Sequence, residues 1–271
     1  PKEVIGFGNN FKNTLRSLEL SPKPIAAAIN GTALGGGFEI CLACNYRVAA
    51  DNPKTLIGLP EVKLGLLPGA GGPQRLPRLI GIRNALPLLL EGTHLSPEKA
   101  LKQGLIHAIV SADELMAAAK KWIVDGGDAV QPWDQKGFKV PGGGPQSPQG
   151  YETFTAGGAM LRKKTWGNYP APVAIMSCVY EGLNCAFDAG LSLESRHFAS
   201  LAADNVAHNM VRTLFFSMGD ANKLKNRPKD VEKSEFKKIG ILGAGMMGAG
   251  IANVTAMAGL QVVLLDSTLE S

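Results

Sequence analysis

The sequence predicts an α/β protein: one larger unit of short strands and helices, then a helical region, then the start of a second α/β unit. Three stretches carry this prediction. Residues 24–29 form a short apolar run closed by Asn30-Gly31, and residues 36–44 are apolar on nearly every face, which is typical of a buried strand and a buried helix. Residues 236–266 show the order strand, glycine-rich turn, helix and strand.

Composition fits a globular enzyme and argues against two other classes. At 271 residues, of which 45% are apolar, the chain can bury a large core, and two domains are expected. The formal net charge is +5, but no motif with interleaved aromatic residues accompanies the lysines of residues 223–238, so nucleic-acid binding is a poor fit. No apolar run is long enough to span a membrane.

Local signals place the other elements in order. Residues 11–18 have a helix-like pattern, and Ser96-Pro97-Glu98 begins a second helix with a cap and a first-turn proline. Residues 105–110 read as a strand, and Ser111 to Glu114 form a capping box before a helix over 115–124.

The domain organisation follows from changes in composition. We predict a core at 1–125, a Gly- and Pro-rich linker or surface insertion at 126–150, a helical region at 151–235 and the second α/β unit at 236–271.

Two carboxylates lie in otherwise apolar surroundings beside the triple glycine Gly35-Gly36-Gly37. Glu39 is one turn inside the apolar helix, and Glu61 follows a proline in a segment that we expect to be non-helical. A buried carboxylate is costly as packing alone, whereas first-turn N–H groups can stabilise an oxygen that becomes negative. We choose Gly36 as the N–H donor. The alternative is a tight helix–sheet contact at the glycines, with both glutamates at solvated ends.

The second glycine motif has the context of a dinucleotide site. Gly243, Gly245 and Gly248 follow a strand and open a helix, and Asp266 ends the next strand. The backbone near Met247 would meet a pyrophosphate, and Asp266 would hold ribose hydroxyls, which favours NAD over NADP. An accidental glycine-rich turn is the alternative.

Cysteines and histidines carry no predicted chemistry. Cys41 and Cys44 have C-x-x-C spacing, but they belong to the buried helix, so core packing explains them better than a redox or metal site. The histidines are scattered, and no metal is expected.

Residues 22–50 (PKPIAAAINGTALGGGFEICLACNYRVAA) and 58–81 (GLPEVKLGLLPGAGGPQRLPRLIG) resemble the central motif of the crotonase (enoyl-CoA hydratase) superfamily. Residues 10–271 resemble those members in which a 3-hydroxyacyl-CoA dehydrogenase follows the hydratase in one polypeptide. The resemblance implies a fold of repeated strand-strand-helix units and a truncated Rossmann start. It places the oxyanion glycine at Gly36 and the catalytic glutamates at Glu39 and Glu61. The spacer between the glutamates is about two residues longer than the family pattern, which a turn-rich loop can absorb.

The activity implied by the resemblance is syn hydration of trans-2-enoyl-CoA in fatty-acid β-oxidation. Glu39 would deprotonate water and Glu61 would deliver a proton to the α-carbon. Isomerisation of 3-enoyl-CoA to 2-enoyl-CoA and a non-catalytic scaffold that docks a thiolase subunit are the alternatives.

The resemblance also implies an acyl-CoA substrate, NAD for the dehydrogenase part and an oligomer. It implies a bacterial cytoplasmic location, or a mitochondrial or peroxisomal one in a eukaryote. We further expect the chain to be a piece of a longer polypeptide, with the second oxyanion donor lying before Pro1, so that the piece alone would be a poor hydratase and would not bind NAD measurably.

Overall fold

The computed structural model describes residues 2–232 and 234–267 and divides into two compact units, 1–220 and 221–271. The larger unit contains two small parallel sheets. β1 (Ala26–Ile29), β3 (Tyr46–Ala50) and β5 (Ala108–Val110) pair in the order β1-β3-β5, and β2 (Ala33–Leu34) pairs with β4 (Ile57–Gly58). Residue 26 aligns with 46, and residue 48 with 108. The strand predicted over 24–29 is thus confirmed at residues 26–29 as β1, although only Ile29 in it is buried and the three alanines are half-buried.

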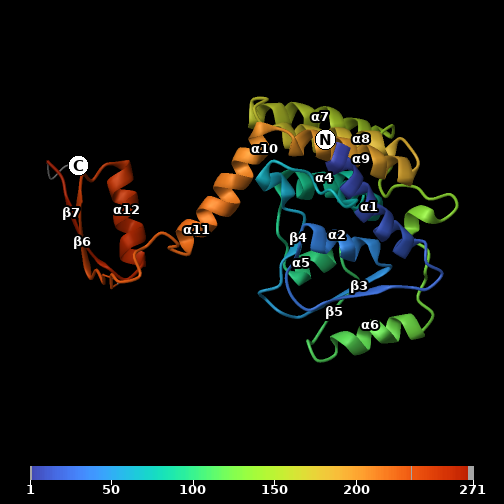
Figure 1. Ribbon diagram of the computed structural model, residues 1–271, viewed down its shortest axis with the longest axis horizontal. Coiled ribbons are helices and arrows are strands. Elements are labelled where there is room, and N and C mark those ends of the chain that lie inside the picture. Colours follow the sequence, from blue (N-terminus) through green and yellow to red (C-terminus); the bar gives the residue numbers. More distant parts are fainter. Residues whose placement is uncertain (1, 233, 268–271) are drawn as a thin grey trace. The chain divides into compact units, whose positions relative to one another are not determined.

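Helices cover both sheets (Figure 1). The N-terminal helices are α1 (Lys2–Glu19), α2 (Gly36–Ala43), α3 (Gly72–Ile80), α4 (Ile82–Glu91), α5 (Pro97–Lys102) and α6 (Leu115–Val124). In Figure 1, α6 lies beside β3 and β5, at the opposite end of the unit from α7, α8 and α9. The main core joins α2, α3, α4 and α8, with Phe38, Leu42, Leu76 and Ile175 among its fully buried side chains.

Helices follow one another from residue 148 to residue 222, whereas the sequence predicted a helical region over 151–235. It comprises α7 (Pro148–Thr165), α8 (Pro170–Leu183), α9 (Phe187–Ala202), α10 (Asn205–Met210), the π-helix η3 (Val211–Ser217) and α11 (Met218–Asn222). Ser147 and Asp204 cap α7 and α10 by accepting from Gly150 N–H and Val206 N–H, as short polar side chains do at helix starts. Phe154 of α7 meets Tyr180 of α8 edge to face, at 5.1 Å between ring centroids.

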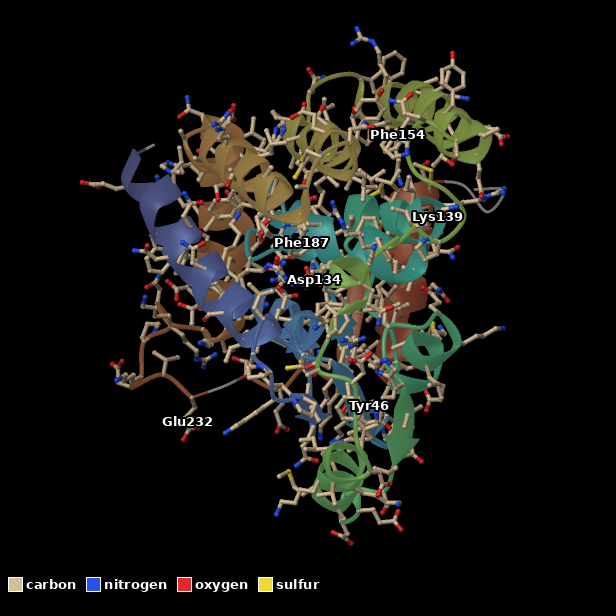
Figure 2. All side chains as sticks on the ribbon, turned by 90° about the vertical axis from the view of Figure 1, so that its right-hand side faces the viewer. Tyr46, Asp134, Lys139, Phe154, Phe187 and Glu232 are labelled. Atoms are coloured by element: carbon tan, nitrogen blue, oxygen red, sulfur yellow. The ribbon has the colours of Figure 1, made fainter. Side chains whose placement is uncertain are left out.

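Residues 126–150 pack against the rest of the larger unit through several specific contacts. The Gln131 amide donates to the Ala43 carbonyl at 2.9 Å, and the Trp133 ring stacks on Phe187 at 5.5 Å. Asp134, in the 3-10 helix η2 (Pro132–Asp134), accepts two hydrogen bonds from Arg16. Figure 2 shows Asp134 and Phe187 close together beside α1. The Gly- and Pro-rich stretch therefore joins distant elements rather than hanging free.

Capping explains where one predicted helix begins and fails for another. Ser96 Oγ accepts from Lys99 N–H at the start of α5, as the Ser-Pro-Glu pattern predicts. α6 begins at Leu115 as predicted, but no side chain caps it. Ser111 Oγ donates to the Glu114 carboxylate at 2.7 Å instead, so the predicted capping box does not form. Tyr46 lies between the rings of His107 and Trp122, at 4.9 and 4.8 Å, and so joins α6 to the sheet (Figure 2).

The smaller unit contains β6 (Lys238–Leu242), α12 (Met246–Met257) and β7 (Gln261–Leu265), and β6 and β7 are parallel. The predicted strand, turn, helix and strand over 236–266 are confirmed. Gly259 follows α12 with a φ of 84°, a left-handed conformation that ends helices and favours glycine. Across the described ranges, none of the helices is long and apolar enough to cross a membrane.

Candidate active site

Parallel pairing of β2 and β4 brings the triple glycine beside Glu61. The register pairs Leu34 with Gly58, and Gly35 N–H continues the ladder by donating to the Gly58 carbonyl at 2.9 Å. Segments that leave neighbouring parallel strands at the same edge stay close together. The start of α2 and the segment before Glu61 therefore become neighbours, although they are more than twenty residues apart in sequence.

Gly35 has to be glycine for two reasons. Its φ is 58°, and a Cβ atom built there would lie 2.9 Å from Glu61 Oε1. A side chain would be strained and would also collide with the carboxylate. The same distance shows that Glu61 Oε1 lies against the N-terminal turn of α2.

Glu61 lies in a helical turn, contrary to the expectation of a non-helical segment. It begins the 3-10 helix η1 (Glu61–Leu64), which follows Pro60 and ends at Gly65 with a φ of 78°. Proline is favoured just before such a turn and a left-handed glycine ends it, so a single turn forms. Glu61 Oε2 is buried without a hydrogen-bond partner among the described residues, which leaves this oxygen available for a substrate or water.

Glu39 is confirmed as a buried helical carboxylate, and it is held by backbone N–H groups. Its side chain is 2% exposed. Its Oε1 accepts hydrogen bonds from Ala70 N–H and Gly72 N–H, both at 2.7 Å. Gly72 is the first residue of α3, so this carboxylate lies at the positive end of a helix dipole. A Cβ at residue 72 would lie 3.0 Å from Glu39 Oε1, and glycine therefore permits the close approach.

Burial shifts the pKa of both carboxyls toward neutrality. Burial, then the charges of Glu61 and Glu194, raises the pKa of Glu39 from 4.5 to about 8, and the Gly72 and Ala70 N–H groups oppose the rise. Burial also raises the pKa of Glu61 to about 7, with the Glu194 charge adding to it. Groups that titrate near the working pH are suited to acid–base catalysis.

Gly36 is the first residue of α2, where its N–H has no acceptor within the helix. The residue is exposed, and a Cβ built there would meet nothing within 4 Å. A substrate oxygen can therefore approach this backbone N–H from open space. Gly36, Glu39 and Glu61 thus gather at one end of α2, as the sequence predicts.

Four charged side chains that were not predicted from the sequence surround the turn 69–72, namely Lys12, Glu19, Arg75 and Glu194. Glu194 of α9 accepts from Gly71 N–H at 2.7 Å and from Lys12 Nζ at 3.0 Å. Arg75 binds both carboxylate oxygens of Glu19 at 2.7 and 2.9 Å. A signal was present for Glu194, because it falls on the buried stripe of α9 with Gly190 and Leu191. Its cation is 182 residues away in sequence, so no local pattern could reveal the pair.

The glycine-rich turn of the smaller unit has the features of a phosphate cradle. Gly243 has a φ of 98°, and a Cβ at Gly248 would lie 1.7 Å from the Gly243 carbonyl oxygen, so α12 can approach the turn only with glycine there. Gly245 caps α12 without a side-chain hydrogen bond, which leaves the N–H groups near Met247 open to an anion. Asp266 accepts from Ala244 N–H at 2.5 Å, so its carboxylate lies beside the turn.

Comparisons with known proteins match a segment in each of the two units to a family model. Residues 3–126 match the family model described as enoyl-CoA hydratase/isomerase. This part of the chain belongs to the enoyl-CoA hydratase/isomerase family. Residues 238–271 match the family model described as 3-hydroxyacyl-CoA dehydrogenase, NAD binding domain. The α/β fold class, with a crotonase-like unit before the start of a Rossmann domain, is thereby confirmed.

Relatives of this enoyl-CoA hydratase/isomerase family member include proteins named fatty acid oxidation complex subunit alpha. Those from Shewanella halifaxensis and Vibrio parahaemolyticus are each 42% identical to this chain, over 94% and 93% of its length. The chain spans 35% of the length of each of these relatives. Among solved structures, an enoyl-CoA hydratase from Bacillus anthracis is 26% identical and covers 87% of this chain and 72% of its own, with a TM-score of 0.44.

Proposed function

We propose that the larger unit catalyses syn addition of water to trans-2-enoyl-CoA in fatty-acid β-oxidation. The observation that carries this proposal is the pair of carboxyls Glu39 and Glu61, each with its pKa near neutrality, beside the N-terminal turn of α2. The family model that matches residues 3–126 is described as enoyl-CoA hydratase/isomerase, and the names of the relatives refer to fatty acid oxidation, which supports the proposal.

The geometry suggests how the residues divide the reaction. The Gly36 N–H and the dipole of α2 stabilise the thioester oxygen as it gains negative charge, which makes the β-carbon electrophilic. In the reactive form the two interacting carboxyls hold one proton between them, and it lies on Glu61. Glu39 as carboxylate takes a proton from water while the water oxygen bonds to the β-carbon. Glu61 as carboxylic acid donates its proton to the α-carbon. One water molecule is consumed, and the two carboxyls have exchanged protonation states after this step. Glu39 then loses its proton and Glu61 gains one by exchange with solvent, which restores the starting state.

We further propose that the smaller unit is part of an NAD site of a 3-hydroxyacyl-CoA dehydrogenase in the natural protein. Gly243, Gly245, Met247 and Gly248 would surround the pyrophosphate, and Asp266 would bind the adenosine ribose. NAD supplies hydride transfer when it is bound. An oligomer, a thiolase partner and a bacterial cytoplasmic location remain predictions of the family resemblance, and the bacterial origin of the relatives supports the last of these.

The decisive experiment replaces each carboxyl with an amide in the natural protein. We expect Glu39→Gln and Glu61→Gln each to lower the rate of crotonyl-CoA hydration by about a hundredfold to ten-thousandfold, with acyl-CoA binding retained because neither change alters side-chain size. Glu91→Gln is the matched control, since Glu91 is an exposed carboxylate paired with Lys164.

Each alternative reading predicts a different outcome. If the natural protein converted 3-enoyl-CoA to 2-enoyl-CoA but did not hydrate the product, the isomerase reading would replace ours. Near wild-type hydration in either amide variant would exclude that residue as a catalytic group. Acyl-CoA binding without turnover of either substrate would favour the scaffold.

A further inference from the structure

The turn that holds Glu39 uses three consecutive N–H groups in two directions. Ala70 N–H and Gly72 N–H donate to Glu39 Oε1, while Gly71 N–H, between them, donates to Glu194 Oε1 at 2.7 Å. The direction of the middle group therefore fixes the direction of its two neighbours. Any movement of Gly71 away from Glu194 would also turn its neighbours away from Glu39.

Glu194 is an unusual side chain to find at this position. It is fully buried, as is Lys12, whose Nζ lies 3.0 Å from Glu194 Oε1. Glu194 Oε2 has no hydrogen-bond partner among the described residues. Well-packed apolar side chains would stabilise a fold as well as or better than a buried ion pair with an unsatisfied oxygen. Stabilisation of the fold is thus a weak explanation for the presence of the buried Lys12–Glu194 ion pair.

The opposite side of the turn is held independently. Arg75 Nη1 donates to the Ala70 carbonyl at 2.7 Å, and Glu19 fixes Arg75 through two hydrogen bonds. Gly71 has a φ of 101°, and a Cβ there would lie 1.8 Å from Arg75 Nη1. Arg75 and Glu19 thus fix the carbonyl side of the turn, and Lys12 with Glu194 fixes its N–H side.

We propose that Lys12 and Glu194 form a positioning pair for Glu39, which aligns the Ala70 and Gly72 N–H groups through Gly71 and places a negative charge beside both catalytic carboxyls. The catalytic part of this inference rests on the proposed hydratase function. Neither residue of the pair needs to touch the substrate.

The charges of Lys12 and Glu194 act together with those of the other titratable groups that surround the pair. Those that interact electrostatically with Glu194 are Lys12 of α1, Glu39 of α2, Glu61 of η1, Arg75 of α3 and Cys178 of α8. Burial raises the pKa of Glu194, and Lys12, the Gly71 N–H and Arg75 oppose the rise. An ionised Glu194 holds the pKa of Glu39 and of Glu61 higher than they would otherwise be.

Two double variants of the natural protein separate the two roles. Lys12→Met/Glu194→Gln removes both charges but keeps an acceptor for Gly71 N–H. We expect both limbs of its pH–rate profile for crotonyl-CoA hydration to move to lower pH by about one unit. Lys12→Met/Glu194→Met also removes the acceptor for Gly71 N–H. We expect its kcat to be about tenfold to a hundredfold lower than that of Lys12→Met/Glu194→Gln, with KM little changed, because Glu39 loses its alignment.

Asp188→Asn is the matched control. Asp188 is a carboxylate on the same helix that pairs with Arg16 of α1, but it is 69% exposed and makes none of the contacts of the turn. Wild-type kcat and an unshifted pH profile in both double variants would overturn the proposal. If neither double variant folds, Lys12→Arg is the variant to test, because it keeps the positive charge on a side chain of different shape. There we expect a several-fold lower kcat with an unchanged pH profile, and an unchanged kcat would overturn the positioning role.

Failure of the proposed function would look different. A natural protein that hydrates no 2-enoyl-CoA would refute the function, and the positioning pair would then be tested by infrared titration of the Glu39 carboxyl. The band assigned by comparison with Glu39→Gln should titrate at lower pH in Lys12→Met/Glu194→Gln than in the unaltered protein. An identical titration in both would overturn the inference without reference to turnover.

Discussion

Glu39 and Glu61 of the larger unit have pKa values well above that of an exposed glutamate, and therefore retain their protons to higher pH. Burial is the main cause for Glu39 and Glu61, and like charges nearby add to it. The ionised form is disfavoured because the interior solvates charge poorly. This property makes the residues useful as acid and base, and it also links folding stability to pH.

Stability of the larger unit should therefore fall as the pH rises. The pKa of Glu39 is about 8 in the folded state against 4.5 when it is not shifted, so the folded state binds more protons between these values. The stabilisation is fully present below pH 4.5 and is lost as the pH rises through 8. We expect the thermal midpoint to fall by at least about 4 °C between pH 6 and 9, and by less in Glu39→Gln.

Calorimetry of both proteins at the two pH values measures this difference. The Glu39→Gln variant removes the group while other titrations remain, so the comparison isolates its contribution. An equal fall in both proteins would show that Glu39 does not titrate as proposed.

At the scale of elements, glycines decide how closely a helix approaches the turn before it. Gly71 leaves room for the Arg75 side chain, and Gly72 leaves room for the Glu39 carboxylate at the start of α3. Gly248 allows α12 to approach the Gly243 carbonyl. Each close contact leaves N–H groups at a helix start open to a carboxylate or to a phosphate. The same local arrangement thus occurs at the proposed acid–base site of one unit and at the proposed nucleotide site of the other.

We expect Gly248→Ala to weaken NAD binding at least about tenfold in the natural protein. A Cβ at this position would lie 1.7 Å from the Gly243 carbonyl oxygen, so the turn or α12 has to move and the phosphate cradle is distorted. Gly250→Ala is the matched control, because a Cβ there meets nothing within 4 Å. Isothermal titration with NAD gives both affinities, and equal affinities would refute the cradle.

At the scale of the whole molecule, the two carboxyls proposed to be catalytic and the glycine-rich turn belong to different compact units, 1–220 and 221–271. Each unit forms its own contacts around its own site. The two chemistries should therefore respond to different substitutions.

Asp266→Ala should weaken NAD binding by at least about tenfold and leave hydration of crotonyl-CoA unchanged in the natural protein. The substitution removes the ribose acceptor and the hydrogen bond to Ala244 N–H. Asp266→Asn, which keeps an acceptor for that N–H, isolates the charge. NAD titration and the hydration assay test both parts, and a parallel loss of the two activities would contradict separate sites.

Sequence alone determined the local features of this protein. The strand at 24–29, the apolar helix after the triple glycine, and the strand, turn and helix at 236–257 follow from apolar periodicity, glycine and proline. These signals come from residues close together in the sequence, so they can be recognised without knowledge of the tertiary structure. Gly36, Glu39 and Glu61 could be chosen as candidates because carboxylates stood out in apolar surroundings.

Tertiary structure decided which distant groups meet. Pairing of β2 with β4 places Glu61 against Gly35. The Lys12–Glu194 pair joins residues 182 positions apart. Burial raises the pKa of Glu39 only once α1, α3 and α9 close around it. Long-range pairing and desolvation depend on the complete fold, because no short segment can exclude water from a carboxylate by itself.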